Sequence, residues 1–241
     1  MKAFIFAAGL GTRLRPLTFD RPKALVEVAG KTMLERTFDT LKAAGFTDFV
    51  VNVHHFADQI VDFLAEHDNF GCNVSISDER SLLLDTGGAI AAARDLLGDE
   101  PFLVHNVDIV SNLDIRSFVE EGLAGALARL VVSDRPSSRK LLFDAEDCLC
   151  GWINLKTSEV KGPAAARPEL VARELAFSGI HLISPEVFDL MEKWPARFSV
   201  IDFYLAMSFD HCIRSAVPEG FKLKDMGTPQ AVAAFEDYAD I

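Results

Sequence analysis

Two aspartates that end separate apolar runs are the residues best suited to hold a divalent cation. Asp108 follows the run at residues 102–107, and Asp225 follows the run at residues 221–224. If both runs are strands, the two carboxylates lie at strand ends, where α/β sheets bind their ligands. Mg²⁺ prefers oxygen ligands and keeps waters and phosphate oxygens in its shell. The pair therefore predicts a Mg²⁺ site formed by Asp108 and Asp225.

A glycine- and arginine-rich segment follows the first apolar run, residues 3–7. Its small and polar residues are Ala8, Gly9, Gly11, Thr12 and Arg13. Backbone N–H groups beside small residues can surround a phosphate chain, while Arg13 and Lys23 neutralise it. A dinucleotide fingerprint would require glycine where Leu14 stands, and Pro16 and Pro22 do not fit the helix that opens after an ATPase phosphate loop. The segment therefore predicts a triphosphate site of another kind.

The composition excludes several classes of partner. The net charge of −12 over 241 residues disfavours nucleic acid and anionic membranes, yet residues 9–23 carry four basic side chains against one acidic one. No apolar run is long enough to span a bilayer, and the first residues lack a signal-peptide pattern, so a cytoplasmic protein is expected. The four cysteines lack zinc-site spacing and are predicted to be reduced thiols.

The order of apolar runs indicates how these residues are positioned. Strand-like segments at 3–7, 49–53, 74–77 and 102–107 alternate with helix-like segments at 33–44, 57–66 and 89–97. This order predicts an α/β fold, a Rossmann-like three-layer sandwich with a mixed, mainly parallel central sheet. Shorter runs between 126 and 183 predict a small antiparallel insertion, with a long mobile loop at 157–174. The chain, 1–241, is expected to form a single domain.

These motifs resemble those of the sugar-phosphate nucleotidylyltransferase family. The resemblance rests on Ala-Ala-Gly-x-Gly-Thr-Arg-Leu-x-Pro-Leu-Thr at 7–18, Pro-Lys-x-Leu at 22–25, the strand-ending Asp108, and Asp-x-Gly-Thr-Pro at 225–229. It spans most of the chain and is weak between 126 and 174. It implies Mg²⁺-dependent transfer from a nucleoside triphosphate to a sugar 1-phosphate, with Arg13, Lys23 and Asp108 at the reacting centre.

The same resemblance divides the chain into two functional halves. Residues 1–125 would bind the nucleotide, and residues 126–241 would bind the sugar and supply the second metal carboxylate. Compact uridylyl- and guanylyltransferases of the family are the most similar, which favours UTP or GTP. A homodimer is possible.

Further residues are candidates for the base and the sugar. Asp85 and Gly88 precede a helix, where Gly88 could let the base approach the backbone; relatives often have glutamate in place of Asp85. Asn106 shares a strand face with Asp108, so it either contacts nucleotide and sugar or is buried for packing reasons. Ser178 and Gly179 resemble the family's sugar-facing strand, although a bulge would explain Gly179 equally well.

The lysine on the sugar phosphate and two rival functions remain open. The family's Glu-Lys-Pro triplet is absent, so Lys156 or Lys161 is proposed to replace its lysine. A phosphocholine cytidylyltransferase of the same fold would need an aromatic or acidic cage, to which Trp152 and Trp194 could contribute. A non-catalytic nucleotide-sugar sensor would be expected to have lost Lys23, Asp108 or Asp225, and all three are present.

Overall fold

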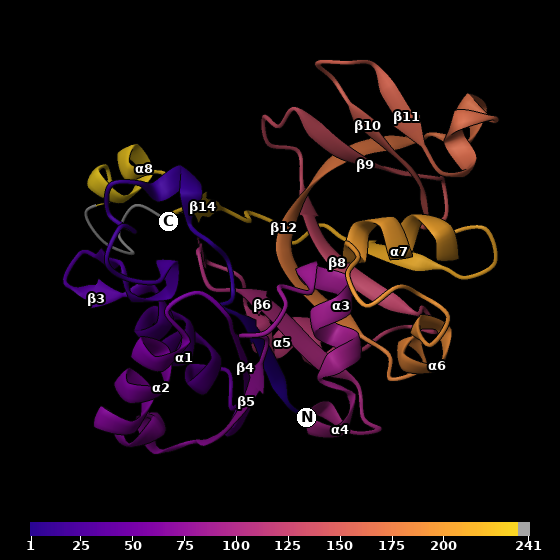
Figure 1. Cartoon of the computed structure of the whole chain (residues 1–241). Helices are drawn as coiled ribbons and strands as arrows, with labels where there is room; N and C mark the ends of the chain where they lie inside the picture. Colours follow the sequence, from indigo (N-terminus) through magenta and orange to yellow (C-terminus); the bar gives the residue numbers. More distant parts are fainter. Residues whose placement is uncertain (236–241) are drawn as a thin grey trace.

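The computed structural model describes residues 1–235 and shows an α/β fold built on one large sheet (Figure 1). Its central strands, in spatial order, are β5 (Asn73–Asp78), β4 (Asp48–Val53), β1 (Ala3–Phe6), β6 (Phe102–Asn106), β12 (Arg173–Ile183), β8 (Ala128–Ser133) and β13 (Ile213–Ala216). Neighbours are parallel except at β12, which runs antiparallel to both β6 and β8. The predicted mixed, mainly parallel central sheet is therefore confirmed.

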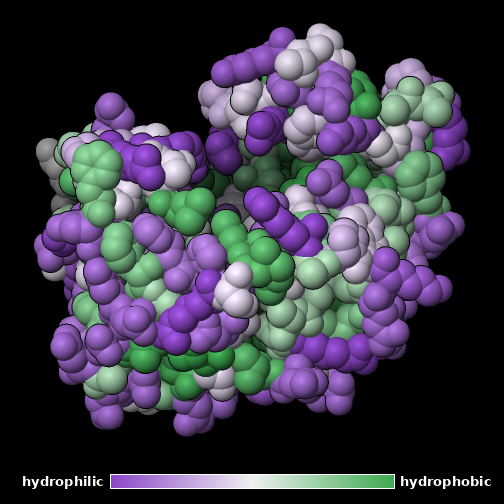
Figure 2. Space-filling model, in the orientation of Figure 1, coloured by the Kyte–Doolittle hydropathy of each residue, from purple (hydrophilic) through white to green (hydrophobic). Residues whose placement is uncertain are grey.

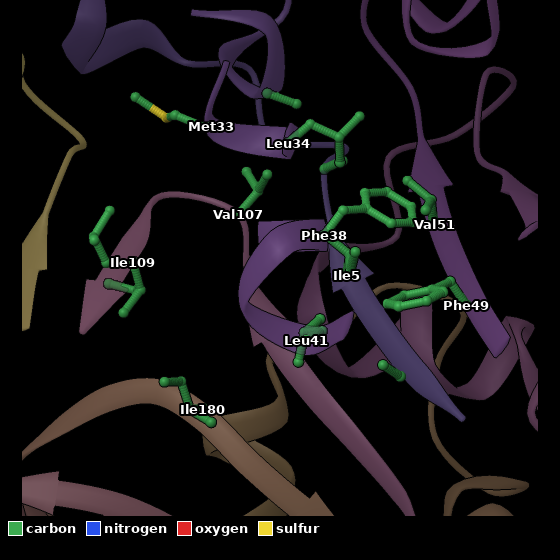
Figure 3. Packing of buried hydrophobic residues seen from close by; sticks show 14 of the residues in the cluster. Ile5, Met33, Leu34, Phe38, Leu41, Phe49, Val51, Val107, Ile109 and Ile180 are labelled. Atoms are coloured by element: carbon green, nitrogen blue, oxygen red, sulfur yellow. The ribbon is translucent and has the colours of Figure 1, made fainter. Parts of the chain in front are cut away.

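Helices cover both faces of this sheet and make it a three-layer sandwich. One face carries α1 (Met33–Ala43), α2 (Ala57–Glu66) and α5 (Ile115–Glu120), and the other carries α3 (Asp85–Ala92), α4 (Arg94–Leu97), α6 (Val187–Met191) and α7 (Val200–Met207). Because side chains alternate along a strand, Ile5 of β1 packs in the first layer, with Phe38 and Phe49 (Figure 3), whereas Phe4 packs in the second.

Helix boundaries follow local sequence signals in one case and tertiary contacts in another. Thr32 and Glu35 form the expected capping box at α1, and the helix ends one residue before the predicted position. The predicted helix at residues 89–97 is divided into α3 and α4, because the chain leaves helical geometry at Ala93. In addition, α3 begins earlier than predicted, at Asp85.

An antiparallel sheet of β9 (Arg139–Phe143), β10 (Leu149–Asn154) and β11 (Glu159–Lys161) extends from β12, as the short runs predicted. The mobile loop expected at 157–174 is wrong. That segment contains β11, the 3₁₀ turns η4 (Pro163–Ala165) and η5 (Pro168–Leu170), and the start of β12. Ala164 is buried against Leu142 and Cys150, so apolar packing orders the segment.

A small ribbon joins the two halves of the chain. In it, β7 (Ile109–Ser111) pairs antiparallel with β14 (Leu223–Asp225), and Asp225 lies opposite Ile109. The helix α8 (Pro229–Ala233) follows, capped by Thr228, whose Oγ1 accepts a hydrogen bond from the Ala231 amide at 3.2 Å. The helix was expected to reach Tyr238, which lies outside the described residues.

The cysteines differ from the expectation of four reduced thiols. Cys148 and Cys212 form a disulfide, and Cys72 and Cys150 are free. Cys148 forms an isolated β-bridge with Arg214 of β13. Cys212 directly precedes β13, and its carbonyl accepts a hydrogen bond from the Leu127 amide at 2.8 Å. Both cysteines therefore lie beside the same strand. Spacing along the chain could not reveal this pairing. In residues 1–235, no helix is long and apolar enough to cross a membrane.

Candidate active site

A cavity of about 390 Å³ opens where β1 and β6 end, in the hollow between the β14 side and the β9–β11 lobe (Figure 2). It brings together most of the residues predicted for the nucleotide and the metal. These are Ala8, Gly9, Gly11, Thr12, Arg13, Lys23, Asp85, Asn106 and Asp108. Residues from both halves line it, because Arg197 and Gly227 complete the wall.

The glycine-rich segment is a compact loop. After β1 ends at Phe6, Gly11 adopts a φ of +62°, a left-handed conformation that favours glycine, and the 3₁₀ turn η1 (Thr12–Leu14) follows. The buried Thr18 donates its Oγ1 hydrogen bond to the Gly11 carbonyl at 2.8 Å. A Cβ on Gly11 would lie only 2.9 Å from Cγ2 of Thr18. The loop therefore needs glycine at this position to close.

Asn52, which the motifs do not include, holds the start of this loop. Its Oδ1 accepts hydrogen bonds from the amides of Ala7 and Ala8 at 2.7 and 3.2 Å. Its Nδ2 donates to Glu79 at 2.7 Å, and the second carboxylate oxygen of Glu79 accepts from the Leu84 amide at 3.0 Å. Burial raises the pKa of the Glu79 carboxyl. The available signal was one polar residue within the apolar run 49–53.

The two aspartates of the predicted metal site come together through the β7–β14 ribbon. Asp108, only 5% exposed, forms an ion pair with Lys23 from the turn η2 (Lys23–Leu25). Asp225 faces Arg13, with 3.9 Å between Nη1 and Oδ2, and its Oδ1 accepts a hydrogen bond from the Gly227 amide at 2.7 Å. Each carboxylate thus has a cation beside it.

This donor set fits a Mg²⁺ ion that is shared with a nucleotide. Two carboxylates supply part of an oxygen shell, and Mg²⁺ completes such shells with water and phosphate oxygens. In residues 1–235, no cluster of three or more acidic, histidine or cysteine side chains is arranged to hold a metal. A metal ion held here would therefore take its remaining oxygen ligands from water and substrate.

Asn106 lies beside Gly179. Gly179 has a φ of +74°, and a Cβ built on it would lie 2.6 Å from Nδ2 of Asn106. A side chain at position 179 would therefore displace Asn106 from the cavity wall. The register of β12 against β8 shifts here, so a bulge and a close approach both explain the glycine.

Of the other predicted residues, Asp225 and Gly179 adjoin the cavity wall without lining it, and three lie away from it. Gly88 is packed against the Ala196 carbonyl, which occupies the space expected for a base. The Ser178 hydroxyl is buried without a hydrogen-bond partner in the described residues and does not line this cavity. Lys156 is exposed in the turn after β10 and does not line this cavity either.

Arg197 is a cation of the cavity wall that the motifs missed. It is exposed, and no ion pair joins it to another residue in 1–235. The neighbouring carbonyl of Phe198 accepts hydrogen bonds from the amides of Gly87 and Gly88 at 2.9 and 3.2 Å. These bonds fix the segment that presents Arg197. A lone arginine before an aromatic run gives no recognisable signal in the sequence.

A second cavity, of about 500 Å³, lies between the β9–β11 sheet and the start of α7. Its walls carry Trp152, Lys161, Phe177 and Ser199, with further polar residues. Lys161, one of the two candidates for the sugar phosphate, is therefore in a cavity, but not in the one that contains Asp108.

Comparison with known proteins identifies relatives of this chain. The nucleotidyl transferase family model matches residues 2–135. N-acetylmuramate alpha-1-phosphate uridylyltransferase from Caulobacter vibrioides is 35% identical, over 97% of this chain and 95% of its own. Mannose-1-phosphate guanylyltransferase 1 from Arabidopsis thaliana is 32% identical, over 95% of this chain but 62% of its own length.

Solved structures show the same fold. HddC from Yersinia pseudotuberculosis, complexed with GMP-PN, covers 98% of this chain and 97% of its own with a TM-score of 0.77 at 22% identity. A UDP-glucose pyrophosphorylase complexed with UDP-glucose also has a TM-score of 0.77, at 16% identity and over 100% and 99% of the two chains. The family match over more than half of the sequence, together with the Caulobacter relative, shows that this chain belongs to the nucleotidyl transferase family.

Proposed function

We propose that the chain transfers the uridylyl group of UTP to N-acetylmuramate α-1-phosphate, forming the UDP-sugar and pyrophosphate. The observation that carries the reaction type is that Asp108 lines the cavity beside the glycine-rich loop and pairs with Lys23, while Asp225 faces Arg13 of that loop. The choice of substrates rests on the uridylyltransferase from Caulobacter vibrioides, which matches nearly the whole chain. GTP is the alternative nucleotide, because other relatives are named guanylyltransferases.

The chemistry requires positioning and charge neutralisation more than proton transfer. A sugar 1-phosphate is mostly dianionic at neutral pH, because the second pKa of a phosphate monoester is about 6. Its oxygen can therefore attack the α-phosphorus without a strong base. Arg13 and Lys23 are proposed to neutralise the nucleotide phosphates, and Arg197, across the same cavity, the sugar phosphate. Arg197 replaces Lys156 in this role.

Asp108 and Asp225 are proposed to hold a Mg²⁺ ion, with Asn106 between the nucleotide and the sugar. The ion would stabilise charge on the phosphate oxygens during in-line displacement. Lys23 now pairs with Asp108, so substrate binding is expected to move its ammonium group onto a phosphate. Residues 1–125 then bind the nucleotide, and residues 126–241 supply the sugar site and Asp225.

The rival functions are less well supported. A cage for phosphocholine needs open aromatic faces, but the Lys161 ammonium already lies 5.2 Å from the Trp152 ring centroid, and Trp194 packs on Phe198 and Phe203. A sensor has no evident need for the Lys23–Asp108 pair. We place the reaction in the cytoplasm, where the nucleotide is available. A homodimer is also predicted, and light scattering would measure its mass.

A pyrophosphate-release screen tests the proposal. The four common nucleoside triphosphates are each combined with N-acetylmuramate, N-acetylglucosamine, mannose and glucose α-1-phosphates, and with phosphocholine, in the presence of Mg²⁺. The expected result is the highest kcat/KM with UTP and N-acetylmuramate α-1-phosphate. Release only with phosphocholine and CTP would replace the proposal by its rival, and release with no pair would reject catalysis.

A further inference from the structure

The second cavity has a positive character that the reaction centre does not use. Three cationic residues, Arg139, Lys140 and Lys161, line it, against the two acidic residues Glu159 and Asp202. The chain as a whole carries a net charge of −12. A cationic excess in a cavity of such a protein indicates that the cavity receives an anionic group.

The three cations differ in how far they are already neutralised. Lys140 lies 3.3 Å from an oxygen of Asp134 and donates to the Glu174 carbonyl at 3.4 Å. Lys161 lies 3.8 Å from carboxylate oxygens of both Glu159 and Asp202. Arg139 has no ion pair or side-chain hydrogen bond to a residue in 1–235. Its guanidinium is the cation best placed to bind an incoming anion.

The hairpin β9–β10–β11 arranges these groups around an aromatic side chain. Arg139 pairs across the strands with Asn154, and Trp152 pairs with Lys161. Residues 152 and 154 share one face of β10, because side chains alternate along a strand. Trp152 and Asn154 therefore face the same space, in which the Lys161 ammonium lies 5.2 Å from the Trp152 ring centroid beside a hydrogen-bonding amide, a combination suited to a polar anionic group.

The two cavities are neighbours along two segments of the chain. Arg197 lines the first cavity and Ser199 the second. Phe177 lines the second, and Gly179 of the same strand contacts Asn106 in the wall of the first. Residues two positions apart in a chain lie at most about 7 Å apart, so the two cavities lie side by side. A sugar whose phosphate is at Arg197 would thus extend its substituents towards Trp152 and Arg139.

We propose that the second cavity binds a carboxylate-bearing substituent of the sugar, and that Arg139 is the residue that selects it. This inference rests on the proposed nucleotidyl transfer to a sugar 1-phosphate. The substrate class is a hexose 1-phosphate with an acidic side group, of which N-acetylmuramate α-1-phosphate, with its lactyl ether, is the test case. A bidentate guanidinium suits a planar carboxylate better than an ammonium group does.

The test compares substrates that differ only in that charge. The substrates are N-acetylmuramate α-1-phosphate, its lactyl methyl ester, and N-acetylglucosamine α-1-phosphate, which lacks the lactyl group. Each is assayed for kcat/KM with the wild-type chain, with Arg139→Gln, and with Arg167→Gln as the control. Arg167 is an exposed arginine of the same lobe that lines neither cavity.

The wild-type chain is expected to favour the free acid over its ester by at least tenfold. Arg139→Gln should lower kcat/KM for the acid by roughly 10- to 100-fold, mainly through KM, and should remove most of the preference over the ester. Lys161→Gln should have a smaller effect, because Glu159 and Asp202 already share its charge. Arg167→Gln should keep the wild-type preference.

Two results would overturn the inference. One is an equal decrease of kcat/KM for all three substrates in Arg139→Gln, which would indicate a structural role for Arg139. The other is a wild-type chain that turns over neutral sugar phosphates and does not favour the acid; nucleotidyl transfer to a sugar 1-phosphate would then stand, but the choice of N-acetylmuramate α-1-phosphate would not. If no sugar phosphate releases pyrophosphate, the proposed function itself fails. Circular dichroism of Arg139→Gln separates misfolding from lost recognition.

Discussion

The backbone amide of Met226 donates a hydrogen bond of 2.8 Å to the carbonyl oxygen of Asp108. This bond extends the β7–β14 ribbon by one step and fixes Asp225 next to Asp108, although the two residues belong to different halves of the chain. Met226 is fully buried in the same apolar layer as Ile109. The distance between the two carboxylates therefore depends on core packing as well as on the loops that carry them.

The first prediction concerns this carboxylate pair. Asp108→Asn and Asp225→Asn should each lower kcat by about 10²- to 10³-fold and raise the Mg²⁺ concentration needed for half-maximal rate, because each removes a charged ligand. Chelation by EDTA should abolish turnover of the wild-type chain. The measurement is pyrophosphate release over a Mg²⁺ titration.

The control is Asp99→Asn, which changes an exposed carboxylate that lines neither of the two cavities. It makes the same chemical change at a distance from the site and should retain the wild-type Mg²⁺ dependence. If both site variants titrate with Mg²⁺ as the wild-type chain does, Asp108 and Asp225 do not hold the metal.

The second prediction concerns Asn52. Asn52→Leu keeps the approximate size but leaves the buried amides of Ala7 and Ala8 without an acceptor, at a cost of about 1–3 kcal/mol each. The free energy of unfolding should fall by roughly 2–4 kcal/mol. KM for the nucleotide should rise, because the start of the glycine-rich loop is no longer fixed. Urea denaturation and steady-state kinetics measure the two effects.

A matched control is Asn73→Leu, whose side chain makes an exposed hydrogen bond to Asp48 at 3.1 Å. Its effect on the free energy of unfolding should be small, since water replaces the lost bond. Equal effects of the two substitutions, or an unchanged KM in Asn52→Leu, would contradict a role for Asn52 in holding the loop.

The sequence was sufficient where local chemistry determines structure. The capping box of Thr32 and Glu35, the glycine-rich loop and the strand-end position of Asp108 follow from neighbouring residues. It was insufficient where distant segments meet. The Asn52 network, Arg197 in the cavity wall and the carbonyl that fills the space beside Gly88 depend on tertiary packing, which no spacing of residues reveals.

The third prediction compares two glycines with almost the same backbone angle. Gly179 and Gly125 have φ values of +74° and +77°, so alanine should cost each about 1–2 kcal/mol in strain. Only Gly179→Ala would also bring a methyl group against Asn106, whereas Gly125 has open space around it. Gly179→Ala should therefore lower kcat/KM by about 10- to 100-fold, through displacement of Asn106. Similar kinetics for the two variants would show that strain alone matters.

The fourth prediction concerns the disulfide between Cys148 and Cys212, which are 64 positions apart. Closing a loop of this length stabilises the fold by about 4 kcal/mol in the chain-entropy model. Dithiothreitol, or the double substitution to serine, should lower the free energy of unfolding by about 2–4 kcal/mol. Thiol titration of the denatured, unreduced protein should find the two free cysteines and no others. A count of all four cysteines would mean that the bond is absent in solution.

The fifth prediction concerns stability at acidic pH. His181 is fully buried between Phe177 and Tyr204, with its Nδ1 2.8 Å from the Tyr204 hydroxyl, and burial lowers its pKa to about 3. In the unfolded chain the pKa of a histidine is about 6.5. Between these values the unfolded state binds the proton and the folded state does not, so stability must fall as the pH decreases below about 6.5.

The contribution of His181 between pH 7 and pH 5 is about 2 kcal/mol of lost unfolding free energy. His181→Gln, which cannot be protonated, should remove this part of the pH dependence, whatever its effect on stability at pH 7. His67→Gln serves as the control, because His67 is exposed and shows no such burial. Urea denaturation of the three proteins at both pH values gives the comparison. If His181→Gln loses as much stability as the wild-type chain on acidification, His181 does not stay neutral in the fold, and the acid sensitivity arises from other groups.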